Sequence, residues 1–124
     1  MLSDNSAVAT IPVKKLDRAR DFYSDKLGLT VEEERPGVIT YRSGESKVFV
    51  YESEYAGGNK ATAATWAVND IDQVVSDLTA KGVRFEHYAN LEGLRPEGDL
   101  YVGRDMKVAW LKDPDGNILS LVSG

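Results

Sequence analysis

The sequence lacks cysteine and contains a single histidine among its 124 residues. Without cysteine the chain can form no disulfide, no thiolate zinc site and no cysteine nucleophile. With one histidine it cannot supply the two imidazoles of a two-histidine, one-carboxylate iron site. Disulfide, thiolate and two-histidine iron chemistry are therefore excluded within one chain.

Long apolar runs and an excess of positive charge are missing as well. No stretch approaches the roughly 18 apolar residues of a membrane span, and the start, Met1 to Ser6, is short and polar, unlike a signal peptide. The formal net charge is -5, and an acidic surface repels phosphate backbones. There is no phosphate-binding glycine loop and no nucleophile elbow. We therefore expect a cytoplasmic protein with no nucleic-acid partner and no membrane partner.

The first half of the chain predicts one helix among four strands. Leu16, Ala19, Tyr23 and Leu27 are spaced by three or four residues and therefore share one helical face. Asp17 is expected to cap the start of this helix. Alternating β-branched and aromatic residues predict strands at 7–13, 29–34, 38–42 and 47–52.

The second half repeats this order after a glycine-containing linker at about 53–61. Asp70 or Asp72 is expected to cap its helix. Strands are predicted at 62–68, 83–87, 106–112 and 118–122, with a polar loop at 88–99 and a type I turn at 113–116.

The repeated order predicts an α+β fold made of two βαβββ modules, at about 7–55 and 62–122. One helix can cover only one face of each module's strands. The other faces are left uncovered, and the ordinary twist of a sheet would curve them into a cup. The cup is the natural place to look for a binding site.

Three segments resemble the vicinal oxygen chelate superfamily, the group of glyoxalase I, bleomycin resistance proteins and extradiol dioxygenases. Ile11–Leu29 is similar to its opening strand and helix, Trp66–Asp72 with Lys81–Val83 to its second helix unit, and Trp110–Leu121 to its last hairpin. The resemblance covers roughly residues 9–122, with the motifs in the family's order. It implies the same fold and, from family members that pair modules between chains, a homodimer.

Enzymes of this family hold a divalent metal with one side chain from each of four strands. The resemblance places the corresponding positions at Val8, Val50 or Tyr51, Ala63 and Ser120. None is a usual ligand for a divalent cation, with Ser120 the marginal exception. An oxygen-only site that includes Glu52 stays as an alternative. The chain is thus nearest the metal-free, bleomycin-resistance-like branch, and we expect no metal and no cofactor.

The family's strand register predicts which side chains line the cup. The predicted ligand-binding residues are Val8, Thr10, Val50, Glu52, Ala63, Thr65, Tyr101, Trp110 and Ser120. Trp110 could stack on a ligand, or it could belong to the core. Tyr101 could donate a hydrogen bond, or it could be an ordinary half-buried strand tyrosine. No catalytic residue is assigned.

A small, neutral cup favours binding over chemistry. We expect a metal-independent small-molecule binding protein, possible ligands being aromatic or cationic natural products that such a protein would sequester, as in antibiotic resistance. One alternative is a metal-free lyase or isomerase that uses Glu52, Tyr101 or His87 as acid or base. The other alternative is a non-catalytic dimerisation module.

Overall fold

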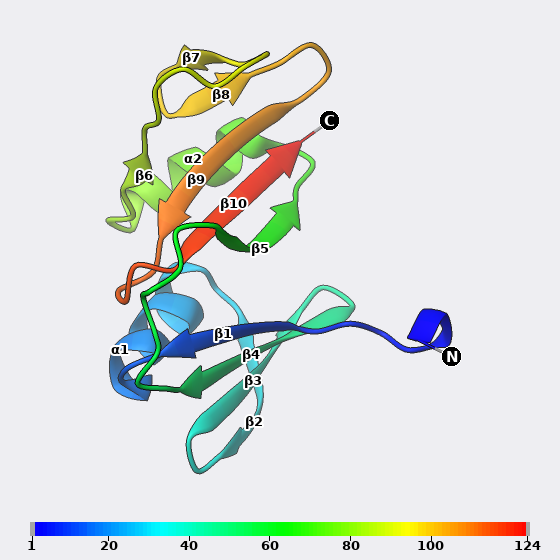
Figure 1. Ribbon diagram of the computed structural model, residues 1–124, viewed down its shortest axis with the longest axis vertical. Helices are drawn as coiled ribbons and strands as arrows, with labels where there is room; N and C mark the ends of the chain where they lie inside the picture. The colour runs from blue at the N-terminus through cyan, green and yellow to red at the C-terminus, as the bar shows by residue number, and fades with distance from the viewer. Residues whose placement is uncertain (1, 124) are drawn as a thin grey trace.

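The first module is a four-stranded sheet with one helix against it. A computed structural model describes residues 2–123 (Figure 1). Its elements are a short helical turn η1 (Leu2–Asp4), β1 (Ala9–Val13), α1 (Leu16–Arg20) continued by the π-helical η2 (Asp21–Lys26), β2 (Thr30–Arg35), β3 (Val38–Ser43) and β4 (Ser46–Glu52). The strand order is β1-β4-β3-β2, with β1 parallel to β4 and the other pairs antiparallel.

The second module repeats this plan with an added hairpin. Its elements are β5 (Thr62–Ala67), α2 (Ile71–Ala80), β6 (Phe85–Glu86), β7 (Arg95–Glu97), β8 (Leu100–Val102), β9 (Lys107–Lys112) and β10 (Ile118–Ser123). The order is β5-β10-β9-β8-β7, and β6 also pairs with β9. The place that β2 holds in the first sheet is thus shared by β6 and β8. The predicted α+β class with a repeated strand and helix order is confirmed.

The β7–β8 hairpin corrects the prediction of an irregular loop at 88–99. Glu97 pairs with Leu100 across a two-residue turn in which Gly98 adopts a positive φ of 65°. Proline disfavours a strand because it has no backbone N–H to donate to a neighbouring strand. Pro96 is tolerated because β7 is the outermost strand of the sheet, where that donor is not needed. The strand predicted at 83–87 is correspondingly short, since β6 spans only Phe85–Glu86.

The two helices begin with different caps. The side chain of Asp70 accepts a hydrogen bond from the Gln73 backbone N–H at 3.2 Å, as an N-cap should. Asp17, in contrast, is not the cap of α1, because the N-cap position is Lys15. The backbone N–H of Leu16 instead donates to Glu52 Oε2 at 3.3 Å. Within residues 2–123 no helix is long and apolar enough to cross a membrane.

Each helix packs on one face of its own sheet, and the other face is uncovered. Figure 1 shows α2 behind β9 and β10, with β1 and β5 side by side where the modules meet. Strand residues that face the helices form one core through both modules. Its fully buried members include Ile11, Val13, Ile39, Val50 and Leu119. The sheets are curved but do not close into a barrel.

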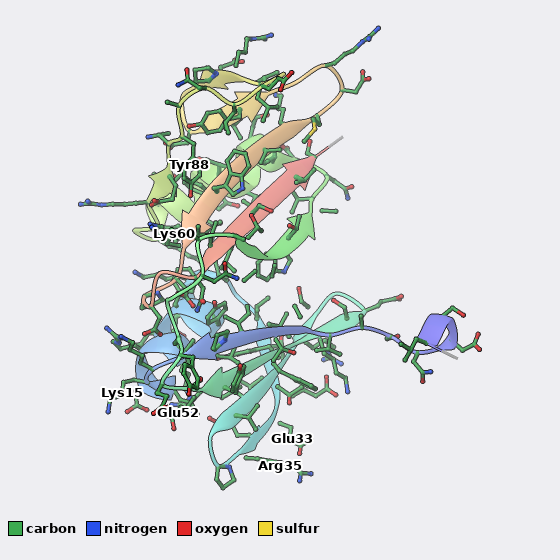
Figure 2. All side chains as sticks on the ribbon, in the orientation of Figure 1. Lys15, Glu33, Arg35, Glu52, Lys60 and Tyr88 are labelled. Carbon is green, nitrogen blue, oxygen red and sulfur yellow. The ribbon has the colours of Figure 1, made fainter. Side chains whose placement is uncertain are left out.

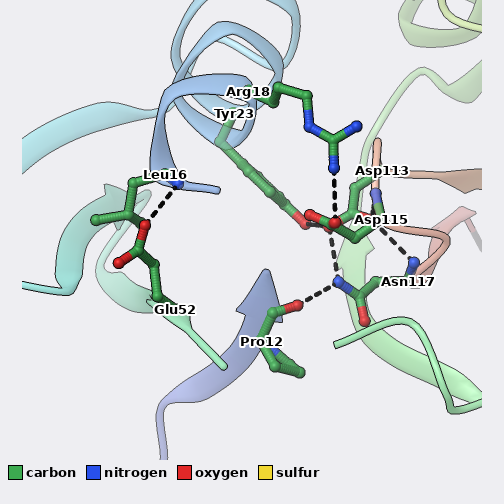
Figure 3. A network of polar contacts seen from close by, with 8 residues as sticks. All are labelled: Pro12, Leu16, Arg18, Tyr23, Glu52, Asp113, Asp115 and Asn117. Atoms are coloured by element: carbon green, nitrogen blue, oxygen red, sulfur yellow. Dashed lines mark hydrogen bonds and ion pairs between the residues drawn. The ribbon is translucent and has the colours of Figure 1, made fainter. Parts of the chain in front are cut away.

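A buried turn joins the second module to the first (Figure 3). Asp113 Oδ1 accepts hydrogen bonds from the backbone N–H groups of Asp115 and Asn117, both at 2.9 Å. Its Oδ2 accepts from Tyr23 Oη at 2.7 Å and from Asn117 Nδ2 at 2.8 Å. Asn117 Nδ2 also donates to the Pro12 carbonyl at 2.7 Å. The sequence 113–117 therefore turns the chain and fixes α1 and β1 at the same time.

Candidate functional site

The uncovered sheet face of the second module, here called the open face, carries a row of four side chains. Thr65, Ser120, Trp110 and Glu86 are register partners on β5, β10, β9 and β6. Partners in register point to the same side of a sheet. The hydroxyls of Thr65 and Ser120 are 2.6 Å apart and hydrogen-bonded, and Ser120 is buried.

Three aromatic rings form a cluster on the open face. The Trp110 ring packs edge-on against Tyr88, with centroids 5.5 Å apart, and against Tyr101 at 5.4 Å. The Tyr101 hydroxyl accepts a hydrogen bond from the Tyr88 backbone N–H and donates to the Tyr88 carbonyl at 3.1 Å. Both polar groups of the Tyr88 backbone are thus held by one side chain. These contacts fix the position of Tyr88 relative to Tyr101 and Trp110.

Tyr88 contributes an unusual hydroxyl. Within residues 2–123, Tyr88 Oη is buried and makes no hydrogen bond. Burial raises the pKa of Tyr88, the negative charge of Glu86 raises it further, and Lys112 opposes the rise. The phenol therefore stays protonated at neutral pH and keeps an unused donor. Figure 2 shows Tyr88 beside the strands of the second module.

The uncovered face of the first module carries both apolar and polar side chains. Thr10 pairs with Phe49, and Pro12 pairs with Tyr51, so these side chains lie on the face away from α1. Tyr51 is 36% exposed. Thr10 Oγ1 donates to the carbonyl of Val8, which precedes β1 and is half-buried. By register Thr40, Arg42 and Lys47 share this face, so it combines an apolar patch at Phe49 and Tyr51 with exposed charged groups.

Two residues predicted to line the cup lie elsewhere. Val50 is fully buried in the core and pairs with Ile11 and Ile39, so its predicted place in the cup is wrong by one residue. Its neighbours Phe49 and Tyr51 occupy the uncovered face. Glu52 shares the face of Val50, and Figure 2 shows it near Lys15, at the start of α1. Its carboxylate accepts from a helix N–H there and does not reach the row on the open face.

The open face brings together four of the predicted residues, Thr65, Tyr101, Trp110 and Ser120. A fifth, the half-buried Ala63, lies at the start of β5. Sequence reasoning missed Tyr88, because the loop that holds it was expected to be irregular. It also missed Phe49, although the alternation of Val48, Phe49 and Val50 could have shown that its side chain opposes the two valines.

The comparison with family models agrees with this architecture. The model of the Glyoxalase/Bleomycin resistance protein/Dioxygenase superfamily matches residues 6–121. The chain belongs to this superfamily. Among curated proteins, none matches the chain.

Solved structures of the superfamily have the same fold. A glyoxalase/bleomycin resistance protein/dioxygenase from Alicyclobacillus acidocaldarius is 22% identical, with a TM-score of 0.72 over 99% of this chain and 94% of its own. The fosfomycin resistance protein FosX from Listeria monocytogenes is 14% identical, with a TM-score of 0.72 over 97% of this chain and 93% of its own. TnmS3, an antibiotic binding protein from a Streptomyces species, is 19% identical, with a TM-score of 0.66 over 94% and 92%. At these identities the likeness shows the fold alone.

The residues at the superfamily's metal positions do not fit a divalent cation. The positions that the resemblance implies, Val8, Val50 or Tyr51, Ala63 and Ser120, offer neither a carboxylate nor an imidazole. In residues 2–123 no group of three or more His, Asp or Glu side chains is arranged to hold a metal. The histidine, His87, is exposed and pairs through Nε2 with Asp99 Oδ1 at 2.9 Å. We therefore derive no chemistry from a metal at this site.

Proposed function

We propose that this superfamily member is a metal-independent binding protein that sequesters an aromatic, preferably cationic, small molecule on the open face. The observation that carries the proposal is the cluster of Tyr88, Tyr101 and Trp110 on a sheet face that no helix covers. Aromatic rings give a large, rigid contact area at small entropic cost. A planar ligand can therefore pack on the half-buried rings of Tyr88 and Trp110, while Tyr101, which is only 2% exposed, supports them through its contacts with both.

The polar groups around the cluster support a ligand with a cationic or donor group. Glu86 lies in the same row as Trp110, and the hydroxyls of Thr65 and Ser120 follow on the other side. The net charge of -5 attracts a cation over a longer range. One of the similar structures is that of an antibiotic binding protein, which is consistent with sequestration of a small molecule.

The same groups support binding over turnover. Glu86, the carboxylate of the row, lies 3.4 Å from Lys112 Nζ. The carboxylate of Glu86 is therefore already engaged by a positive charge of the same sheet. Tyr88 keeps its proton because of its raised pKa. An enzyme that uses Tyr88 or Tyr101 as an acid is the alternative, and product analysis distinguishes the two.

We further propose that two copies form a homodimer in which the uncovered face of the first module is covered. Phe49, Tyr51 and Val38 present an apolar surface on that face. Covering it with the open face of a second copy would enclose the ligand from both sides. Replacement of Tyr51 by Glu should convert the dimer to a monomer in sedimentation experiments, whereas a wild type that is monomeric at all concentrations would refute the dimer.

The binding proposal is tested by calorimetry with bleomycin A2 and, as a simple planar cation, ethidium. Trp110→Leu should weaken binding by about tenfold or more, because it removes the central ring of the cluster. Tyr55→Leu is the matched control, because Tyr55 is 81% exposed and the rings that pack against Trp110 are those of Tyr88 and Tyr101. A bound ligand recovered unchanged after incubation supports sequestration, and a changed one supports an enzyme.

If neither probe binds, bleomycin A2 and ethidium do not represent the ligand class of this protein. A wider screen by thermal shift then decides, since a ligand present at about 100 times its Kd stabilises the folded state by about 2.7 kcal/mol. If Trp110→Leu binds every hit as tightly as the wild type does, the open face is not the site and the proposal fails.

A further inference from the structure

A second cavity lies between the two modules, on the helix side of the sheets and away from the open face. Its volume is about 240 Å³. Leu78, Leu111 and Leu121 form its buried floor, and the half-buried Leu27 and Val74 stand at its mouth. Because several of its lining residues are only half-buried, the cavity opens to solvent, and a small molecule could enter it.

Contacts between the modules surround the cavity and keep its walls in place. Trp66 Nε1 donates a hydrogen bond to Ser43 Oγ at 2.8 Å, and both side chains line the cavity. Lys81, just after α2, donates through Nζ to the Asp25 carbonyl at 3.3 Å. The first bond joins β5 to the end of β3, and the second joins the ends of the two helices. Because these bonds hold the two modules at a fixed separation, the walls could not move inward to fill the cavity without breaking them.

The lining is apolar except at one point. Ser43 Oγ accepts the hydrogen bond from Trp66, so the hydroxyl's own hydrogen can turn toward the cavity. No lining residue carries an ionisable side chain. A charged ligand would therefore lose its hydration without compensation, whereas a neutral ligand with one acceptor would be satisfied.

We propose that this cavity is a second binding site, for a small uncharged molecule with a carbonyl or ether oxygen that accepts a hydrogen bond from Ser43. The volume of about 240 Å³ has room for about eight non-hydrogen atoms, if each takes about the 30 Å³ that a water occupies in the liquid, and for slightly more where the atoms are covalently bonded. A benzene ring with a short ketone substituent meets both requirements. The site is separate from the open face and does not depend on the function proposed above.

The two tryptophans of the chain make the two sites distinguishable. Trp66 lines the cavity, and Trp110 belongs to the cluster on the open face. Their indole N–H signals in a ¹H–¹⁵N spectrum can be assigned with Trp110→Phe. The probes are acetophenone and its isostere cumene, in which a second methyl group replaces the carbonyl oxygen. Acetophenone should shift the Trp66 signal, leave that of Trp110 in place, and bind about three- to tenfold more tightly than cumene.

Two variants test the cavity and its donor separately. Val74→Phe should fill the cavity and abolish the Trp66 response to both probes. Val122→Phe, on the uncovered side of β10, is the matched control and should leave the response intact. Ser43→Ala should remove the preference for acetophenone while cumene still binds. The dispersion of the amide spectrum shows whether each variant is folded.

Several results would overturn the proposal. One is an unmoved Trp66 signal at saturating concentrations of both probes, and another is a response that persists in a folded Val74→Phe variant. An unchanged preference for acetophenone in Ser43→Ala would refute the role of the hydroxyl. A shift of Trp110 alone would assign both probes to the open face, which refutes the second site and leaves the binding function of the open face supported.

Discussion

The hydroxyl of Tyr23, in the helix of the first module, donates a 2.7 Å hydrogen bond to the buried carboxylate of Asp113, in the last turn of the second. The two residues are 90 positions apart in the chain. Asp113 also accepts from Asn117 and from two backbone N–H groups of its own turn. One carboxylate therefore determines both the shape of the turn and the placement of the two modules.

Replacement of Tyr23 by Phe should destabilise the protein by about 1.5–3 kcal/mol, the range for hydrogen bonds to a charged group. The midpoint of urea unfolding measures the loss. Tyr41→Phe is the control, because Tyr41 is also buried but its hydroxyl pairs with the neutral Ser24 hydroxyl at 2.9 Å. It should cost about 1 kcal/mol. Equal losses in the two variants would show that the carboxylate adds nothing to the bond.

Stability should fall at alkaline pH. Burial raises the pKa of Tyr23 well above its usual value, and the charge of Asp113 raises it further. In the unfolded chain tyrosine titrates near pH 10. Above that pH the unfolded state binds fewer protons than the folded state, so the free energy of unfolding falls by about 1.4 kcal/mol per pH unit for this group. Below about pH 10 this tyrosine is protonated in both the folded and the unfolded state, so its contribution to the free energy of unfolding is fully present.

Urea unfolding between about pH 9 and pH 11 would measure this slope. Tyr23→Phe should show a shallower fall, although not a flat one, because burial also raises the pKa of Tyr41 and of Tyr88. Identical slopes in the wild type and Tyr23→Phe would contradict the assignment.

Gly57 should tolerate no side chain. Its φ is +83°, and a Cβ atom there would lie 2.4 Å from the backbone oxygen of Asp115. Gly37 is a matched control, with a φ of +82° and no neighbour within 4 Å of such an atom. Both alanine variants should lose about 1–2 kcal/mol to backbone strain. Gly57→Ala should lose a further 1–3 kcal/mol, roughly the cost of overpacking. Thermal unfolding of the pair would reveal any such difference, and equal midpoints would mean that the linker moves aside freely.

Replacement of Tyr101 by Phe should loosen the backbone at Tyr88. The Tyr101 hydroxyl holds both the N–H and the carbonyl of that residue. Without it, amide hydrogen exchange at Tyr88 should quicken by about tenfold or more, since the amide loses its acceptor. Tyr55→Phe alters an exposed ring and should leave the rate unchanged. If the rate is also unchanged in Tyr101→Phe, other contacts hold the loop.

The sequence predicted the features that depend on local spacing. Alternation along the strands put Ile11, Val13, Leu119 and Leu121 toward the helices, and all four are buried. The same parity put Thr65 and Ser120 on the opposite face, where register pairs them. These predictions succeeded because the side chains of a strand point alternately to its two faces, whatever the partner strands are.

Features that depend on contacts distant in sequence could not be predicted. The turn at 113–116 was expected, but its bond to Tyr23 depends on how the modules pack. Glu52 was expected to line the ligand-binding cup. Its carboxylate instead accepts a hydrogen bond at the start of α1, because β4 ends there. Val50 was placed on the wrong face, since a one-residue error in register inverts a strand's orientation.

The outer strands have a consequence for how the protein behaves in concentrated solution. β1 and β5 lie side by side, and β2, β6 and β7 carry free edges of the two sheets. Every residue of β2 is exposed, its sequence includes Glu32, Glu33 and Glu34, and its pairing is irregular between Val31 and Glu33. Negative charge and irregularity hinder the addition of a foreign strand. A chain with a broad bare sheet face is thereby protected from edge-to-edge aggregation.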